Sequence, residues 1–168
     1  MNLKIISGGQ TGVDQAALRA ARTCGLETGG WAPHGWLTEA GPAPWLAEYG
    51  LHQHDESGSP AFLYRARTEA NVMAAAGCVW FGNPHSPGGK LTLGLCGSAA
   101  YIPQYVVMDA STPKDVANWI FGYLLDGEPE DATIVALIAG NRESSNPGIG
   151  AKVETFLVEV FRLLKEMK

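Results

Sequence analysis

Cysteine and clustered positive charge are both scarce in this 168-residue sequence. Its three cysteines, Cys24, Cys78 and Cys96, lie far apart and form no CxxC pair, which argues against a disulfide framework and a structural zinc site. The 12 Lys and Arg residues are scattered, and 17 Asp and Glu residues bring the net charge to -5. Because electrostatic binding to DNA or RNA needs clustered basic side chains, we expect no nucleic-acid partner.

The sequence also lacks a long apolar run and a recognisable targeting segment. No run approaches the roughly 20 apolar residues of a membrane-spanning helix, and no charged segment followed by a long apolar one opens the chain. We therefore expect no membrane partner and a cytoplasmic location. The composition, 46% hydrophobic and 17% charged, is typical of a folded globule, and the length predicts one domain over residues 1–168.

What the sequence does contain is a regular alternation of short apolar segments and amphipathic ones. Strands are predicted at 3–6, 78–81, 105–108 and 133–138, with less regular strands near 28–31 and 51–54. Helices are predicted at 13–24, 61–76, 90–100 and 114–125, and over a last segment that includes 153–164. This alternation is typical of βαβ units and predicts an α/β protein with a Rossmann-like, doubly wound, mostly parallel sheet flanked by helices.

Three glycine-rich loops, at 7–13, 82–90 and 139–150, follow predicted strands at the carboxyl edge of this sheet, where such folds bind ligands. The first contains Gly8, Gly9, Gln10, Thr11 and Gly12 between a strand and a helix. Backbone amides in such a loop can converge on an anion at the helix start. A tight turn before a capped helix is the alternative interpretation.

The second loop opens a predicted helix with Gly88 and Gly89, followed by Lys90 and Thr92. Lys90 could neutralise a phosphate and Thr92 could donate a hydrogen bond to it. The alternative is a simple turn with a solvated lysine.

Two arginines complete the set of candidates. Arg142, in the third loop, could bind a phosphate through two parallel hydrogen bonds, or pair with Glu143 in solvent. Arg67, Thr68 and Asn71 share one face of a predicted helix, which favours either a ligand site or a solvated face.

Other candidates are weaker. His52 and His54 project to the same side of a predicted strand, but a third metal ligand is not evident, so we expect surface histidines and no metal site. The cysteines fall at positions that suit small buried residues. No pair of carboxylates is spaced for acid–base chemistry, so no catalytic residue is assigned.

Taken together, these loops resemble the molybdenum cofactor carrier proteins, from the first strand to the last helix. The most specific segment is Ser7-Gly8-Gly9-Gln10-Thr11-Gly12-Val13-Asp14. Weaker segments continue the resemblance: Gly29-Gly30-Trp31-Ala32-Pro33-His34-Gly35, Arg67-Thr68-Glu69-Ala70-Asn71-Val72, Gly88-Gly89-Lys90-Leu91-Thr92 and Ala139-Gly140-Asn141-Arg142-Glu143-Ser144.

That family is similar in fold to the lysine-decarboxylase-like group, which includes the LONELY GUY phosphoribohydrolases. Those enzymes use an Arg on a helix and a Pro-Gly-Gly-x-Gly-Thr-x-x-Glu motif. Arg67 matches the Arg, whereas Leu91 and Leu95 stand where the motif has its last Gly and its Glu. Because the carboxylate of that Glu would serve the hydrolysis, its replacement argues against this activity while leaving the phosphate-binding glycines in place.

The resemblance implies a non-catalytic carrier that stores molybdenum cofactor as cargo, a small anionic ligand that bears a phosphate, in a homo-oligomer. The implied ligand-binding residues are Gly8, Gly9, Gln10, Thr11, Gly12, Arg67, Asn71, Gly88, Gly89, Lys90, Thr92 and Arg142. Two alternatives stay open: a hydrolase for a nucleotide or ADP-ribose derivative, which would need Asp14, Glu39 or Glu69 as its carboxylate, and a nucleotide sensor without turnover.

Overall fold

A six-stranded sheet in the order β5-β2-β1-β8-β6-β7 forms the centre of the protein, in a computed structural model that describes residues 2–55 and 57–167. Every neighbouring pair in this sheet is parallel. The strands are β1 (Asn2–Ile6), β2 (Glu27–Ala32), β5 (Leu51–Gln53), β6 (Gly77–Phe81), β7 (Gln104–Val107) and β8 (Thr133–Gly140). The predicted α/β class with a parallel, Rossmann-like sheet is confirmed.

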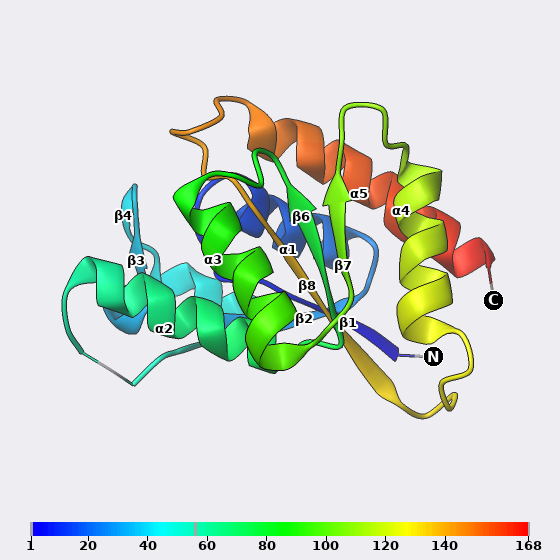
Figure 1. Ribbon diagram of the computed structural model, residues 1–168, viewed down its shortest axis with the longest axis horizontal. Helices are drawn as coiled ribbons and strands as arrows, with labels where there is room; N and C mark the ends of the chain where they lie inside the picture. The colour runs from blue at the N-terminus through cyan, green and yellow to red at the C-terminus, as the bar shows by residue number, and fades with distance from the viewer. Residues whose placement is uncertain (1, 56, 168) are drawn as a thin grey trace.

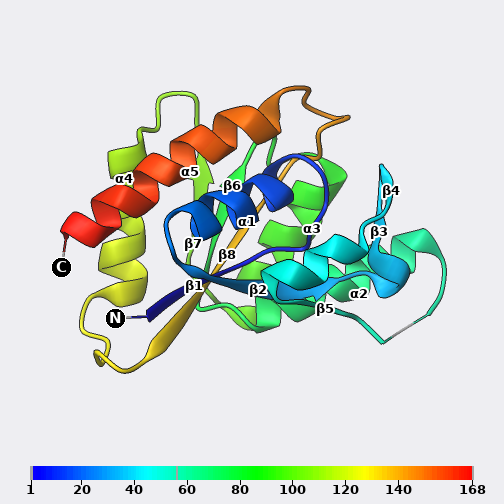
Figure 2. The same cartoon turned by 180° about the vertical axis from the view of Figure 1, so that it is seen from behind.

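Helices cover both faces of the sheet. They are α1 (Val13–Thr23), α2 (Pro60–Met73), α3 (Pro87–Leu95), α4 (Pro113–Ile120) and α5 (Ile149–Glu166). Figure 1 shows α2 and α3 in front of the sheet, and Figure 2, from behind, shows α1, α4 and α5 on the opposite face. No helix in the described residues is both long enough and apolar enough to cross a membrane.

The alternation of side chains along the strands explains the two layers. In β6, Val79 and Phe81 belong to the apolar core under α1, α4 and α5, whereas Cys78 and Trp80 belong to the core under α2 and α3. Successive side chains of a strand point to opposite faces, so a strand that is apolar throughout must be covered on both. All five residues of β6 are buried accordingly.

The segment between β2 and α2 is folded onto the edge of the sheet. It contains a short 3₁₀ turn η1 (His34–Trp36), a hairpin of β3 (Leu37–Thr38) and β4 (Gly41–Pro42), and a second 3₁₀ turn η2 (Pro44–Tyr49). Leu46 and Leu51 pack with Leu18 of α1 in a third apolar cluster. The strands expected near 28–31 and 51–54 are confirmed as β2 and β5.

The helix predicted at 90–100 begins and ends at other residues in the structure. It begins at Pro87, because the Ser86 side chain accepts a hydrogen bond from Gly89 N–H and proline suits the first helical position. It ends as α3 at Leu95 and continues as a wider π turn, η3 (Cys96–Ala100). Residues 87–90, which the glycines made look like loop, are therefore the first turn of α3.

The strand order places the loops after β1, β8 and β6 side by side at the carboxyl edge. The chain moves outward from β1 through β2 to β5 on one side and from β6 to β7 on the other, and β8 returns between β1 and β6. Strand order thus reverses around β8, which is the position where parallel sheets bind ligands. Residues 7–12, 82–86 and 141–148 meet there.

Candidate functional site

Most backbone amides of the loop after β1 already have acceptors within the protein. Gln10 N–H donates to Asp14 Oδ2 at 3.2 Å, and Thr11 N–H donates to Gln10 Oε1 at 3.0 Å. Val13 N–H donates to the Asn141 carbonyl at 3.3 Å. The loop is therefore folded around the buried carboxyl group of Asp14, a side chain of the protein itself.

Arg67 of α2 is the cationic partner of Asp14. Its Nη1 lies 3.2 Å from Asp14 Oδ2, and the two side chains are only 12% and 5% exposed. Burial raises the pKa of the Asp14 carboxyl above its ordinary value, while the Arg67 guanidinium and the Gln10 amide act in the opposite direction. A Cβ at Gly8 would lie 1.5 Å from Arg67 Nη1, so glycine is required there for Arg67 to reach Asp14.

A second arginine, Arg142, approaches the same aromatic ring as Arg67. The guanidinium carbons of Arg67 and Arg142 lie 5.9 Å and 5.3 Å from the centre of the Tyr64 ring. Loops and helices far apart in the sequence thus bring two cations to one place. Both distances fall within cation–π range.

Two buried donors of this cluster have no hydrogen-bond acceptor among the described residues: Gln10 Nε2 and Arg67 Nε. A buried N–H without an acceptor costs about 1–3 kcal/mol, so such groups are rare and commonly mark a position where a ligand or ordered water accepts.

Asn71 fixes the turn of α2 that carries Arg67. Its side-chain amide donates to the Trp31 carbonyl and accepts from Trp31 N–H, both at 2.9 Å. The side chain is 2% exposed. These two bonds hold α2 against β2, where a Cβ at Gly30 would approach Asn71 Oδ1 to 2.9 Å.

Glu39, at the tip of the β3–β4 hairpin, connects two of the loops. Its carboxylate accepts from Thr11 Oγ1 and from both the amide, at 3.1 Å, and the hydroxyl of Ser144. Desolvation alone would raise the pKa of Glu39, but the hydrogen bonds from Ser144 and Thr11, with help from Arg142, hold that pKa below its ordinary value. These hydrogen bonds hold the tip of the hairpin against the loops after β1 and β8, and we call the contacts of Glu39 with Thr11 and Ser144 the Glu39 latch.

Asn141 joins the loop after β8 to the loop after β6. Its Oδ1 accepts from Asn83 N–H at 2.7 Å, and its Nδ2 donates to Ser86 Oγ at 3.1 Å. The same Ser86 hydroxyl accepts from Gly89 N–H at 3.1 Å. The start of α3 is therefore capped by serine and tied to β8.

The structure brings part of the predicted site into one cluster: Gly8 to Gly12, Arg67 and Arg142. The predicted ligand-binding residues of α3 differ in exposure: Gly88 and Lys90 are exposed, whereas Thr92 is buried. Gly89 packs against the backbone of loop 82–86, where a Cβ would lie 2.4 Å from the Pro84 carbonyl oxygen. A ligand role for Gly88, Gly89, Lys90 and Thr92 stays a prediction.

Sequence reasoning missed Tyr64, Asn141 and Ser86 as parts of the site. Tyr64 lies three residues before Arg67, a helical spacing that puts the two on one face. Asn141 directly follows a buried strand, and Ser86 precedes proline as a helix cap does. These signals were present, but they were indistinguishable from ordinary capping and loop residues.

His52 and His54 lie at the edge of the sheet, in and directly after β5. The rings of His52 and His54 lie 5.9 Å and 6.0 Å from the Trp31 ring. Within residues 2–55 and 57–167, no group of three or more His, Cys, Asp or Glu side chains is arranged to hold a metal ion.

The parallel sheet, its order reversal and the glycine loops at the carboxyl edge define a Rossmann-like α/β protein with a candidate anion site. The sequence pattern of the circularly permuted YpsA SLOG family matches residues 5–161, so the chain belongs to that family. A crystal structure of a "putative molybdenum carrier protein" from Syntrophus aciditrophicus SB is similar, with a TM-score of 0.76 and 32% sequence identity. The similarity covers 94% of this chain and 93% of that one.

These findings confirm the relationship to the molybdenum carrier family that the loop motifs indicated. A comparison with functionally curated proteins gives no match.

Proposed function

We propose that this protein binds and carries a small anion that bears a phosphate, and that molybdenum cofactor is the cargo. The observation that carries the proposal is the pair of buried donors without acceptors among the described residues, Gln10 Nε2 and Arg67 Nε, together with Arg142, whose guanidinium approaches the same Tyr64 ring as that of Arg67. Phosphate oxygens accept several hydrogen bonds at once and favour arginine. The crystal structure from Syntrophus aciditrophicus supports molybdenum-related cargo.

In this proposal Gly8 leaves room for the Arg67 side chain, Gly9 packs against Leu46 and Leu51, and Gln10, Arg67 and Arg142 bind the anion. Thr11 and Gly12 line a cavity of about 850 Å³ with Glu39 and Ser144, the two residues that the latch joins. That volume falls in the range of small-molecule sites. The cargo would enter where the hairpin meets the loop after β8.

Several carboxylates argue for a carrier rather than a hydrolase. Asp14 is committed to Arg67 and to the Gln10 amide, and Glu39 is committed to Thr11 and Ser144. Leu95, at the position of the hydrolase glutamate, packs against the core under α2 and α3. A general base needs to reach its substrate. Asp14 and Glu39 are engaged elsewhere and the hydrolase glutamate is absent, which leaves Glu69, an exposed residue of α2, as the remaining candidate carboxylate.

Native mass spectrometry of the purified chain with molybdenum cofactor, AMP and ADP-ribose tests the proposal. Arg142→Ala is the informative variant, because Arg142 is half-buried and its removal should not disturb the Asp14–Arg67 pair. We expect cofactor retention by the wild type and a loss of about tenfold or more in affinity in Arg142→Ala. Arg65→Ala, an exposed arginine of α2, is the matched control.

Equal retention by wild type, Arg65→Ala and Arg142→Ala would contradict this site. Retention of AMP or ADP-ribose in preference to the cofactor, if it is lost in Arg142→Ala, would replace the proposed cargo with a nucleotide. Release of a hydrolysed product from either nucleotide would overturn the non-catalytic assignment.

A further inference from the structure

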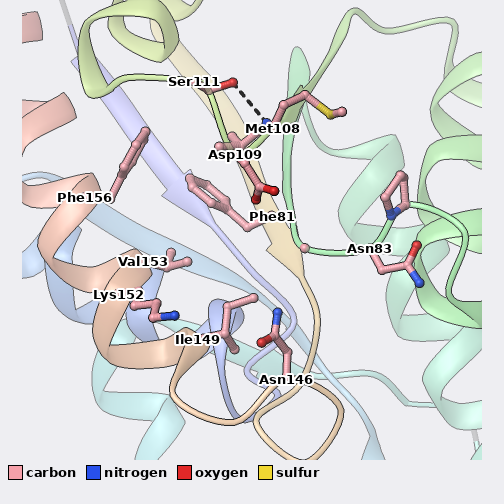
Figure 3. A pocket seen from close by; sticks show the side chains of 13 residues that line it. Phe81, Asn83, Met108, Asp109, Ser111, Asn146, Ile149, Lys152, Val153 and Phe156 are labelled. Carbon is pink, nitrogen blue, oxygen red and sulfur yellow. Dashed lines mark hydrogen bonds between the residues drawn. The ribbon is translucent and has the colours of Figure 1, made fainter.

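A second cavity lies at the same edge of the sheet, on the face covered by α4 and α5. It is about 560 Å³ and is formed where the loops after β6 and β7 meet the first turns of α5. Its floor is apolar and consists of Phe81, Val107, Ile149, Val153 and Phe156. Figure 3 shows Phe81, Ile149, Val153 and Phe156 around the cavity, and the volume is that of typical small-molecule sites.

Two opposite charges stand at separate places on the rim. Figure 3 shows the carboxylate of Asp109, in the loop after β7, near the Phe81 ring, and it shows the Lys152 side chain on α5. Both residues are exposed, and no ion pair of either residue occurs in the part of the chain that the structure describes. A site with one unpaired carboxylate and one unpaired ammonium over an apolar floor is complementary to a ligand with a donor at one end and an anion at the other.

The position of Asp109 is held by its own loop. Met108 N–H donates to Ser111 Oγ at 3.0 Å, a bond drawn in Figure 3. Tyr105 Oη and Ser111 Oγ lie 3.4 Å apart, which ties the same loop to β7. The Met108 side chain is 64% exposed at the rim, where a flexible thioether can pack over a planar ring.

The floor favours an aromatic occupant. The Phe81 and Phe156 rings meet edge to face, with centres 5.6 Å apart and planes at 82°, so a further ring can pack against them in an offset or tilted geometry. Amide groups of Asn83 and Asn146 line the same cavity and can pair with ring nitrogens or carbonyl groups.

We propose that this cavity is a second ligand site, separate from the arginine cluster, for a planar heteroaromatic ring that carries an exocyclic amino group and an anionic substituent. The amino group donates to Asp109, the ring lies on Phe81 and its neighbours, and the anion pairs with Lys152. Nucleoside monophosphates and acidic aminopterins share this chemistry. The site does not depend on the cargo assigned to the arginine cluster.

Ligand-observed NMR titration of the full-length chain tests the proposal with four probes. AMP carries both groups, adenosine lacks the anion, IMP has a carbonyl in place of the amino group, and pterin-6-carboxylate represents the second source of the same chemistry. We expect AMP or pterin-6-carboxylate to bind at least about tenfold more tightly than adenosine and IMP, because each lost charge-assisted bond has about that effect.

Substitutions of residues on the rim of the cavity test whether the probes bind there. Lys152→Ala should remove the preference for AMP over adenosine, and Asp109→Asn should remove the preference for AMP over IMP. Arg162→Ala, on the same helix as Lys152 and exposed, is the control. Arg142→Ala should leave this binding unchanged, which separates it from the arginine cluster.

Binding of AMP alone would identify the source as a nucleotide, and binding of pterin-6-carboxylate alone would identify it as a pterin. Absence of binding by all four probes at millimolar concentration would overturn the proposal. So would equal affinity in wild type, Lys152→Ala and Asp109→Asn, or a loss caused only by Arg142→Ala.

Discussion

Arg67 Nη1 lies 3.2 Å from Asp14 Oδ2, and the two residues, 53 positions apart in the chain, form a nearly buried ion pair. The pair joins α2, on one face of the sheet, to the first turn of α1, which packs on the other face, at the carboxyl edge where both faces meet. Removing one partner of such a pair leaves an uncompensated charge, which costs far more than the pair contributes to stability.

We expect Arg67→Ala to lower the free energy of unfolding by about 3–5 kcal/mol at neutral pH, because it leaves the Asp14 carboxylate buried without its cation. Urea denaturation measures this loss. Glu154→Ala, which breaks the partly exposed pair with Arg19, is the control and should cost no more than about 1 kcal/mol. A loss in Arg67→Ala as small as that in Glu154→Ala would show that Asp14 is not charged when buried.

In Arg67→Ala the free energy of unfolding should also depend more strongly on pH than in the wild type. Arg67 lowers the pKa of Asp14 against the larger effect of burial, so its removal raises that pKa further. A carboxyl with a raised pKa in the folded state binds its proton more tightly there than when unfolded, so stability falls as pH rises from its ordinary pKa, 3.8, toward the raised value. The measurement is the free energy of unfolding from pH 4 to 8. It should fall with rising pH in Arg67→Ala, and this fall should be absent in the Arg67→Ala, Asp14→Asn double variant.

Gly8→Ala should displace the Arg67 guanidinium, since the new Cβ would lie 1.5 Å from Nη1 and a side chain can move where backbone cannot. We expect a lower stability together with a changed NMR resonance of Arg67 Nε–H. Gly94→Ala is the matched control, because no atom lies within 4 Å of its added Cβ and alanine favours the α3 helix by about 0.5–1 kcal/mol. An unchanged Arg67 resonance in Gly8→Ala would contradict the close approach.

The Glu39 latch should open in acid. Its pKa is lowered in the folded state, so its hydrogen bonds contribute stability above its ordinary pKa of 4.5 and are lost as pH falls through the lowered value. Amide hydrogen exchange of Ser144 reports the opening directly, because Ser144 N–H donates to Glu39 at 3.1 Å. In Glu39→Gln the Ser144 amide should exchange faster than in the wild type at every pH tested. Protection of the Ser144 amide that does not change with pH in the wild type would disprove the latch.

Glu143 stabilises the start of α5. Its carboxylate accepts from Gly148 N–H and, at 3.1 Å, from Gly150 N–H, which are otherwise free donors at a helix N-terminus. Glu143→Ala should therefore lower the free energy of unfolding by about 1 kcal/mol. Glu159→Ala, an exposed change farther along α5, should have a smaller effect in the same denaturation experiment. Equal effects would show that the cap contributes nothing.

The spacing of apolar residues and the positions of glycine and proline between the apolar segments were sufficient to predict the class of fold. Each of the four apolar runs predicted as strands, at 3–6, 78–81, 105–108 and 133–138, became a strand of the parallel sheet, which helices cover on both faces. The beginning of α3 was predicted three residues late, since Pro87, Gly88 and Gly89 are typical of a loop and only Ser86 beside them indicates a helix start. The family relationship was visible in Ser7 to Asp14, a string of residues close together in the chain.

The chemistry of the candidate site was decided by tertiary structure. Sequence indicated that Gly8, Arg67 and Arg142 belong to ligand-binding segments, but the partner of Arg67 is Asp14 and the ring that both arginines approach is that of Tyr64. The Glu39 latch and the Asn141 bridge likewise join residues from different loops. Strand and helix patterns arise from neighbours along the chain, whereas burial, pairing and pKa depend on contacts made only when the strand order brings distant loops to one edge.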